Sequence, residues 1–190
     1  MTARRAGLRL PRTLVSQDPE KVRRFCDELD YQVVAKTLGG SQRTPTATGK
    51  VTPGLLSDTS IQLCPTIYQE LVPGTHHLRV CCFGRTVHAA MLETEGLDWR
   101  YPFDATVQPY QLDDDTASRL LQVIDDLCLR MGIIDMKLAP DGSPVWLEVN
   151  PQGQFLFLEG LCNELSLIRA FADFFLAEAA SNARGREART

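Results

Sequence analysis

The segment 134–154, IDMKLAPDGSPVWLEVNPQGQ, carries the strongest structural signal in the chain. Around the turn-forming Pro140-Asp141-Gly142 it predicts two strands, over 133–139 and 144–150. Apolar and polar residues alternate on both sides of the turn, which is typical of strands with one buried face. We therefore expect an antiparallel hairpin here, within a sheet.

The register of this hairpin decides which polar groups meet. A four-residue loop over 140–143 would place Asp135 directly opposite Glu148, whereas a shorter loop or a bulge would shift the pairing by one. Two facing carboxylates repel unless a cation lies between them. Asn150 adds an amide oxygen on the same face, and such oxygens suit Mg²⁺. We predict a metal site from Asp135, Glu148 and Asn150; the alternative is solvated carboxylates, one of them paired with Lys137.

The same alternation predicts burial along the second strand. Val145, Leu147 and Val149 share one face, and this leaves Trp146 on the polar face with Glu148. If the two carboxylates only repel each other, replacing either of them should leave the fold intact or slightly more stable.

The remaining segments predict an α+β fold. Asp18-Pro19 is typical of a helix start, and 40–60 has the composition of a long mobile loop. Gly84-Arg85 fits a two-residue hairpin turn. The predicted strands are 31–38, 66–72, 77–83 and 86–93, and the predicted helices run from Asp113–Asp115 to Met131 and over about 164–180, the last one buried.

The composition excludes several classes of function. The 190 residues are 44% hydrophobic and 23% charged, with 20 basic against 24 acidic side chains and a net charge of −4. This mild acidity argues against nucleic-acid binding. No apolar run reaches the roughly 18–20 residues of a membrane helix, and the start has no signal-peptide pattern. We expect a cytoplasmic protein without a membrane or nucleic-acid partner.

Two basic side chains are candidate phosphate ligands. Lys36 ends a predicted strand that leads into Gly39, Gly40 and Ser41, whose backbone N–H groups can approach a phosphate. Arg79 lies in a strand between apolar neighbours, where a solvated position fits equally well. The strand end at Glu70, Leu71 and Val72 offers backbone groups to the edge of an adenine.

Together these stretches resemble the catalytic part of an ATP-grasp ligase. Within that superfamily the chain is most similar to the ATP-grasp ribosomal peptide maturases, relatives of the microviridin ligases; ribosomal-protein glutamate ligases are more distant. The resemblance runs from about Gly7 to Leu176 and includes VVAKTLGG, YQELVPGTHHLRVCCFG, the DWR at Asp98–Arg100, and 134–154. It implies two α+β lobes with the nucleotide between their antiparallel sheets.

The resemblance also implies a domain plan. We expect a small lobe over 1–75, a large lobe with the metal site over 76–180, and a disordered tail over 181–190. The N-terminal domain that usually precedes this fold is expected to be absent. Apolar Leu8, Leu10 and Pro11 would then be left uncovered, which is consistent with a homodimer.

Roles for individual residues follow from the same resemblance. Lys36 would contact the α- and β-phosphates, Gly39, Gly40 and Ser41 would form a flexible lid, and Glu70, Leu71 and Val72 would be the hinge that reads adenine. Arg79 would neutralise phosphate charge, Arg100 would lie near the reacting end, and Asp135, Glu148 and Asn150 would hold Mg²⁺. His77 stands where relatives often have an acidic residue.

The implied activity is an ATP- and Mg²⁺-dependent ligase. A side-chain carboxylate of a ribosomally made precursor peptide would be activated as an acyl-phosphate and attacked by a hydroxyl or an amine, giving an ester or an amide. Two alternatives stay open: a carboxylate-amine ligase that adds glutamate to a protein, and a truncated non-catalytic ATP-binding module.

Overall fold

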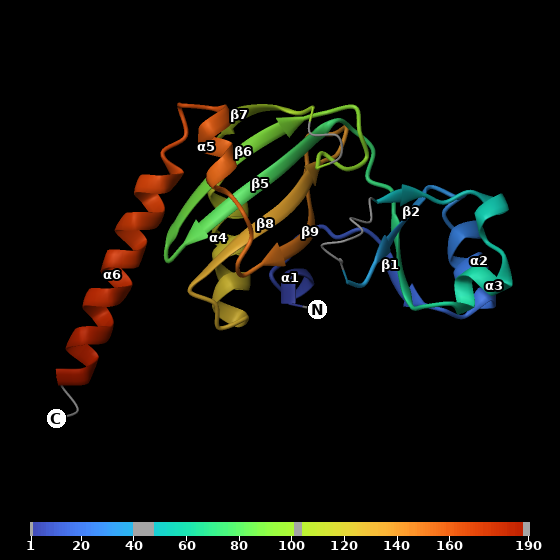
Figure 1. The fold of residues 1–190 in the computed structure, drawn as a ribbon, viewed down its shortest axis with the longest axis horizontal. Coiled ribbons are helices and arrows are strands. Elements are labelled where there is room, and N and C mark those ends of the chain that lie inside the picture. Colours follow the sequence, from blue (N-terminus) through green and yellow to red (C-terminus); the bar gives the residue numbers. More distant parts are fainter. Residues whose placement is uncertain (1, 40–47, 101–103, 188–190) are drawn as a thin grey trace.

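Two antiparallel sheets form the framework of the protein. The computed structural model describes residues 2–39, 48–100 and 104–187. A four-stranded sheet has the order β1-β4-β2-β3, and a five-stranded sheet has the order β7-β6-β5-β8-β9. The small sheet and its helices lie at one end of the molecule, and α6 extends away from the large sheet at the other end (Figure 1). The predicted α+β class is confirmed.

The small lobe is built on one sheet face covered by short helices. Its elements are β1 (Thr13–Ser16), α2 (Pro19–Asp27), β2 (Val33–Thr37), β3 (Gly49–Lys50), the 3₁₀-helix η1 (Pro53–Leu55), α3 (Asp58–Gln62) and β4 (Thr66–Glu70). The Asp18 carboxylate accepts hydrogen bonds from the backbone N–H groups of Glu20 and Lys21, so α2 begins where the sequence predicts. Val22, Cys26 and Tyr68 are among the residues of its core.

The segment 40–60 contains more structure than the long loop predicted for it. β3, η1 and the start of α3 fall within it. Val51 and Leu56 are buried there in the small-lobe core. Because the segment is mostly small and polar, its overall composition predicts a loop and does not reveal these two core residues. Residues 40–47 lie outside the described residues.

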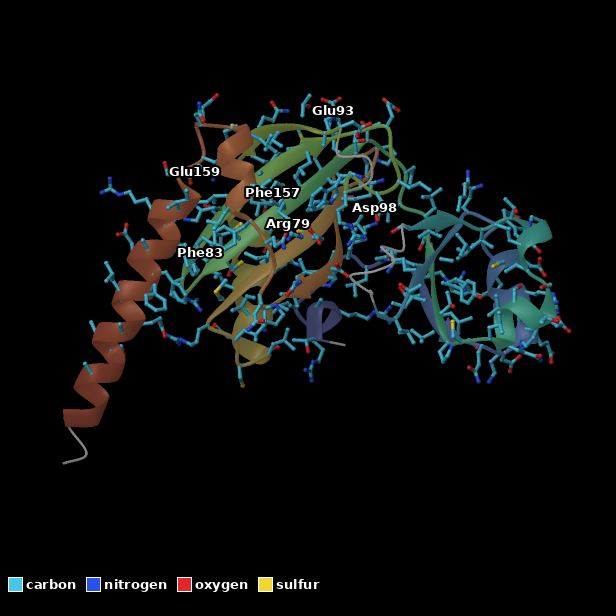
Figure 2. The ribbon with its side chains drawn as sticks, in the orientation of Figure 1. Arg79, Phe83, Glu93, Asp98, Phe157 and Glu159 are labelled. Carbon is cyan, nitrogen blue, oxygen red and sulfur yellow. The ribbon has the colours of Figure 1, made fainter. Side chains whose placement is uncertain are left out.

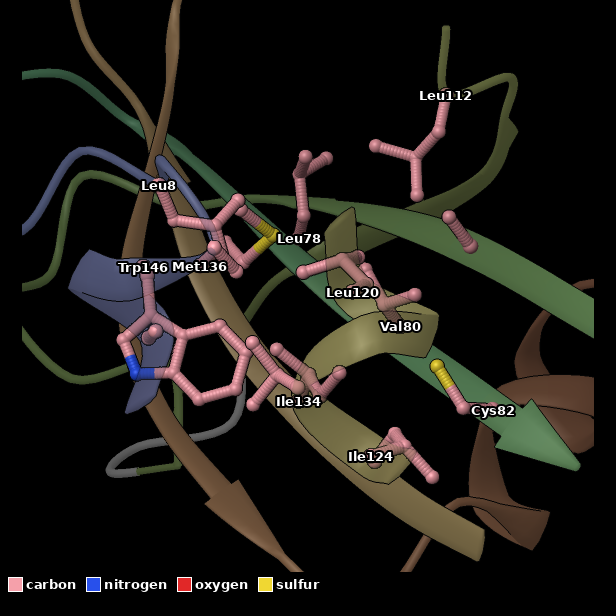
Figure 3. Close-up of a cluster of buried hydrophobic side chains, with 14 residues drawn as sticks. Leu8, Leu78, Val80, Cys82, Leu112, Leu120, Ile124, Ile134, Met136 and Trp146 are labelled. Atoms are coloured by element: carbon pink, nitrogen blue, oxygen red, sulfur yellow. The ribbon is translucent and has the colours of Figure 1, made fainter. Parts of the chain in front are cut away.

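The large lobe packs helices on both faces of its sheet. Its elements are α1 (Thr2–Arg5), β5 (His76–Phe83), β6 (Thr86–Glu93), β7 (Thr106–Tyr110), α4 (Asp114–Asp126), β8 (Met131–Leu138), β9 (Pro144–Asn150), α5 (Leu156–Leu161) and α6 (Leu167–Glu187). One face packs against α1 and α4, in the cluster drawn in Figure 3. The other face packs against α5 and the start of α6. Gly84 has a φ of +59°, as the predicted hairpin turn between β5 and β6 requires.

A bulge sets the register of the β8–β9 hairpin. Leu138 pairs with Pro144, so the loop is one residue longer than predicted, and Met136 pairs with Trp146. A shift between Met136 and Asp135 then places Asp135 opposite Glu148. The predicted carboxylate pairing is therefore confirmed, although it is reached through a longer loop and a compensating bulge.

The bulge corrects the predicted faces of β9. Trp146 is 3% exposed and packs in the core beside Met136 and Leu8, not on the polar face (Figure 3). Val145 and Leu147 lie instead in a small cluster with Val72. Strict alternation fails here because the extra residue of the bulge moves the preceding side chains of β9 to the opposite face of the sheet.

Two helix predictions need correction. α4 ends at Asp126, well before Met131, because Cys128 takes up a φ of +56° and Met131 already begins β8. The last predicted helix, over about 164–180, corresponds to α6 (Leu167–Glu187), which is not buried as predicted, and α5 before it was not predicted. Phe175 and Leu176 in α6 are 63% and 67% exposed, so its apolar residues do not form one core-facing stripe.

The N-terminal residues pack within this chain. Leu8 lies in the core of the large lobe, Leu10 packs against that core, and Pro11 is buried. The uncovered surface from which a homodimer was inferred is therefore not present. The lobe boundaries stay a prediction, but α6 continues to Glu187, through part of the segment expected to be a disordered tail.

Among the helices that the structure describes, none combines the length and apolar character that crossing a membrane requires.

Candidate functional site

A cleft between the two lobes gathers most of the residues that the sequence singled out. Lys36 and the strand end Glu70–Val72 line it from the small lobe, and Asp135 and Glu148 line it from the large lobe. A cavity of about 840 Å³ adjoins it, lined by Arg79, Asn150, Phe157 and others. Both spaces share four residues: Trp99, Arg100, Asp135 and Glu148. The sheet face that carries Arg79 is the one covered by α5 (Figure 2).

Arg79 and Asp135 form a buried ion pair at the centre of the site. They are direct cross-strand neighbours in β5 and β8. Nη1 of Arg79 donates to both carboxylate oxygens of Asp135, at 2.6 and 2.7 Å, and Nη2 donates to the backbone carbonyl of Gln154 at 2.6 Å. Arg79 is 7% exposed. The solvated alternative for Arg79 is therefore wrong, and its phosphate contact stays a prediction.

The loop after β9 is shaped to receive this arginine. A Cβ atom on Gly153 would lie 2.7 Å from Cβ of Ile133 and 3.2 Å from Nη2 of Arg79. Only a residue without a side chain lets the backbone pass this close to β8 and hold the Gln154 carbonyl at the guanidinium. The indole of Trp99 covers Arg79 from outside, with the guanidinium carbon 5.5 Å from the ring centroid.

The carboxylates of Asp135 and Glu148 fit a divalent cation. Burial raises the pKa of Asp135, the Arg79 charge opposes this, and the Glu148 charge raises it further. A cation beside Asp135 would favour its ionised form. Asn150 lies on the same face, and its Oδ1 accepts a hydrogen bond from the backbone N–H of Gln152 at 2.9 Å, which orients the amide oxygen. This set of hard oxygen donors suits Mg²⁺.

Lys36 is held in place from its own lobe. Its Nζ donates to Oε1 of Gln69 at 2.8 Å. Burial lowers the pKa of Lys36, and the charge of Glu148 opposes that change. The Lys36 ammonium group therefore interacts electrostatically with a carboxylate of the opposite lobe. Such a position suits a lysine that binds phosphate in the cleft.

The structure describes the predicted hinge and the first residue of the predicted lid. Gly39 is exposed just after β2, whereas Gly40 and Ser41 lie outside the described residues. At the hinge, the Leu71 N–H donates to the Gln32 carbonyl at 2.8 Å, so it takes no part in reading a base. The Glu70 carboxylate accepts a hydrogen bond from the Arg12 N–H at 2.9 Å. Recognition of adenine by the other backbone groups of this strand end stays a prediction.

Arg100 is anchored to Asp98 at the mouth of the site. Its Nε and Nη2 donate to the two oxygens of Asp98 at 2.7 and 2.6 Å. Burial alone would raise the pKa of Asp98, but the hydrogen bonds from Arg100 lower it to about 2. Asp98 also accepts hydrogen bonds from the N–H and the hydroxyl of Thr48, and so links this loop to the small lobe.

Several residues of the site were not singled out from the sequence, among them Trp99, His77 and Lys137. The DWR stretch contains Trp99, for which the sequence predicts no role, and His77 differs from the acidic residue that relatives often have at its position. Lys137 was considered only as a partner for a carboxylate, although strand alternation places it on the face of Asp135. Burial lowers the pKa of Lys137, and the Lys36 charge lowers it further.

His77 predicts a measurable pH dependence of stability. Burial, and then the charge of Lys137, lower its pKa from 6.5 to about 4. The unfolded chain therefore binds a proton that the folded chain excludes, and stability falls as the pH drops from about 6.5 towards 4, by up to roughly 3 kcal/mol. Urea unfolding of wild type and His77→Gln at pH 7 and pH 4.5 should show a clearly smaller loss in the variant. Equal losses in both proteins would contradict the assignment.

Solved structures of known proteins resemble this chain closely. Macrocyclase MdnC from Microcystis aeruginosa MRC, bound with precursor peptide MdnA, is 32% identical with a TM-score of 0.80, over 90% of this chain and 57% of that chain. The Chryseobacterium gregarium RiPP-associated ATP-grasp ligase, in complex with ADP and a leader and core peptide, is 25% identical with a TM-score of 0.82, over 93% and 57%. PsnB, complexed with a phosphomimetic variant of its minimal precursor, Mg and ADP, is 25% identical with a TM-score of 0.79, over 94% and 56%.

These comparisons identify the fold of the chain. The two lobes, their antiparallel sheets and the cleft between them are the ATP-grasp fold, and this chain has that fold. The resemblance to ATP-grasp maturases of ribosomal peptides, predicted from the sequence, is confirmed. The chain spans a little over half the length of each of these proteins. No protein-family model and no curated protein sequence matches it.

Proposed function

We propose that the chain is the nucleotide-binding and catalytic part of an ATP- and Mg²⁺-dependent ligase that activates a carboxylate of a peptide. One observation carries the proposal: Lys36 of one lobe and the Asp135–Glu148 pair of the other line a single cleft. A lysine opposite paired carboxylates is the arrangement that phosphoryl transfer needs, because that reaction depends on positioning and charge neutralisation. The similar ligases described above were solved with ADP, Mg and peptides.

Each of the predicted site residues would have a separate role in this reaction. Asp135, Glu148 and Asn150 would hold Mg²⁺, which neutralises phosphate charge when bound. Arg79 positions Asp135 through its ion pair. Lys36 would bind phosphate oxygens from the small lobe, and Arg100 would face the reacting end from the adjoining cavity.

The reaction we infer transfers the terminal phosphoryl group of ATP to a side-chain carboxylate of a ribosomally made precursor peptide. A hydroxyl or an amine of the peptide then attacks the acyl-phosphate, an ester or an amide forms, and ADP and phosphate leave. The aromatic side chains of Trp99 and Phe157 stack with ring centroids 5.6 Å apart at the wall of the adjoining cavity. They would exclude water from the activated carboxylate, which favours the peptide acceptor over hydrolysis.

Nucleotide binding is tested by a substitution at Lys36. Lys36→Ala should weaken ATP binding by about tenfold or more but leave adenosine binding nearly unchanged, since the lost contact is with phosphate. Calorimetric titration with both ligands measures the two affinities, and Lys50→Ala, on the exposed strand β3, controls for loss of charge. An equal loss for ATP and adenosine would place Lys36 outside the phosphate site.

Ligase activity is tested by ADP release. We expect release to rise when a synthetic peptide with Asp, Glu, Thr and Lys is added, and mass spectrometry to show a peptide that has lost water. Stimulation by free glutamate, with glutamate joined to a protein, would instead support the glutamate-ligase alternative. Tight nucleotide binding with no turnover in either assay would leave a binding module.

A further inference from the structure

Lys137 is a buried lysine that the proposed function does not use. It is 7% exposed, lies in β8 on the face of Asp135, and lines the cleft. Its ammonium group has no hydrogen bond or ion pair with any residue that the structure describes. Nζ is not among the fully enclosed unpartnered atoms of the described residues, so the side chain is buried along its length while its ammonium group faces the cleft without a carboxylate partner. The position is therefore explained best by a ligand that supplies the missing negative charge.

The neighbours of Lys137 point to an anion. In the sheet it lies between His77 on β5 and Val145 on β9, and neither supplies a carboxylate. His77 is itself buried, and its Nε2 has no hydrogen-bond partner among the described residues. The second lysine of the cleft, Lys36, approaches from the small lobe. Asp135 and Glu148 also line this cleft, but among the described residues neither forms an ion pair with Lys137. The two lysines therefore repel each other, and an anionic group between them would remove that repulsion.

We propose that Lys137 binds the α-phosphate of the nucleotide from the side of the large lobe, opposite Lys36. This inference rests on the proposed function. Lys137 lies two residues from Asp135, about 7 Å along the strand. The shift is towards the hinge, since its β9 neighbour Val145 packs against Val72. A nucleotide with its base at the hinge and its terminal phosphates at Asp135 and Glu148 brings its α-phosphate to this intermediate position.

A series of ligands that differ by one phosphate tests the assignment. Affinities for adenosine, AMP and ADP would be measured by calorimetry for wild type, Lys137→Met and Lys137→Gln, with Lys50→Met as the control for charge. We expect both Lys137 variants to bind AMP and ADP about tenfold or more weakly, and adenosine as well as wild type does. The whole effect should arise at the step from adenosine to AMP. Thermal unfolding of each variant confirms that it is folded.

The outcomes separate this inference from the proposed function. If the Lys137 variants keep the wild-type ratio of AMP to adenosine affinity, the α-phosphate contact is refuted while nucleotide binding stands. If wild type binds no ADP, inorganic pyrophosphate is titrated instead. Stabilisation of wild type by pyrophosphate that is lost in Lys137→Met would support an anion site but not the nucleotide function. No binding of either ligand by folded wild type would overturn both.

Discussion

Replacing Asp135 by asparagine should destabilise the protein by about 3–5 kcal/mol, because it leaves the buried Arg79 charge without its partner. This reverses the expectation from sequence that relief of carboxylate repulsion would leave the fold intact or more stable. Glu148→Gln should stay within about 0.5 kcal/mol of wild type, since Glu148 is exposed. Both substitutions should abolish Mg²⁺-dependent nucleotide binding.

Urea unfolding and calorimetry separate these two effects. A matched control is Asp125→Asn, which removes the carboxylate of an exposed ion pair with Arg85 and should cost at most about 1 kcal/mol. If Asp135→Asn unfolds at the same urea concentration as Asp125→Asn, the buried ion pair does not hold the centre of the site. If Glu148→Gln keeps Mg²⁺-dependent binding, Glu148 is not a metal ligand.

The second large effect is expected at Trp146. Trp146→Ala should cost about 3–5 kcal/mol, because its indole fills the core between β8 and α1 (Figure 3). Leu147→Ala should cost clearly less, since Leu147 is only half-buried beside the small cluster at Val72. Trp146→Phe, which keeps an aromatic ring in place, should lie between wild type and Trp146→Ala.

The order of these two costs tests the bulge directly. Without the bulge, alternation would turn Leu147 into the core and Trp146 outwards. A greater loss of stability in Leu147→Ala than in Trp146→Ala, measured by urea unfolding, would contradict the register described here.

The facing carboxylates could be predicted because strand alternation acts over short distances. Asp135 and Glu148 belong to one hairpin, so a turn of known type nearly determines their pairing. The bulge at Leu147 could not be predicted, because it depends on how Trp146 fits against Met136 and α1. The loop is one residue longer than predicted, and the bulge shifts the register back by one residue. The predicted pairing of Asp135 with Glu148 is therefore correct, whereas the predicted orientation of Trp146 is wrong.

Contacts between distant segments were beyond sequence reasoning. The sequence around Arg79 does not indicate that Asp135, 56 residues later, is its neighbour. The same holds for Leu8, which alone reads as exposed apolar surface but packs in the large-lobe core. Lys137 is different, because strand alternation already places it on the same face as Asp135. Its burial was not predicted, because lysines are usually exposed to solvent.

The proposed function depends on a Mg²⁺-dependent nucleotide site between the two lobes. Its most direct test is calorimetric titration of the chain with a non-hydrolysable ATP analogue, with and without Mg²⁺, for wild type and Glu148→Gln. We expect the analogue to bind to wild type only when Mg²⁺ is present, and not to bind to Glu148→Gln. Absence of binding by folded wild type, or equal binding with and without Mg²⁺, would contradict the proposed function.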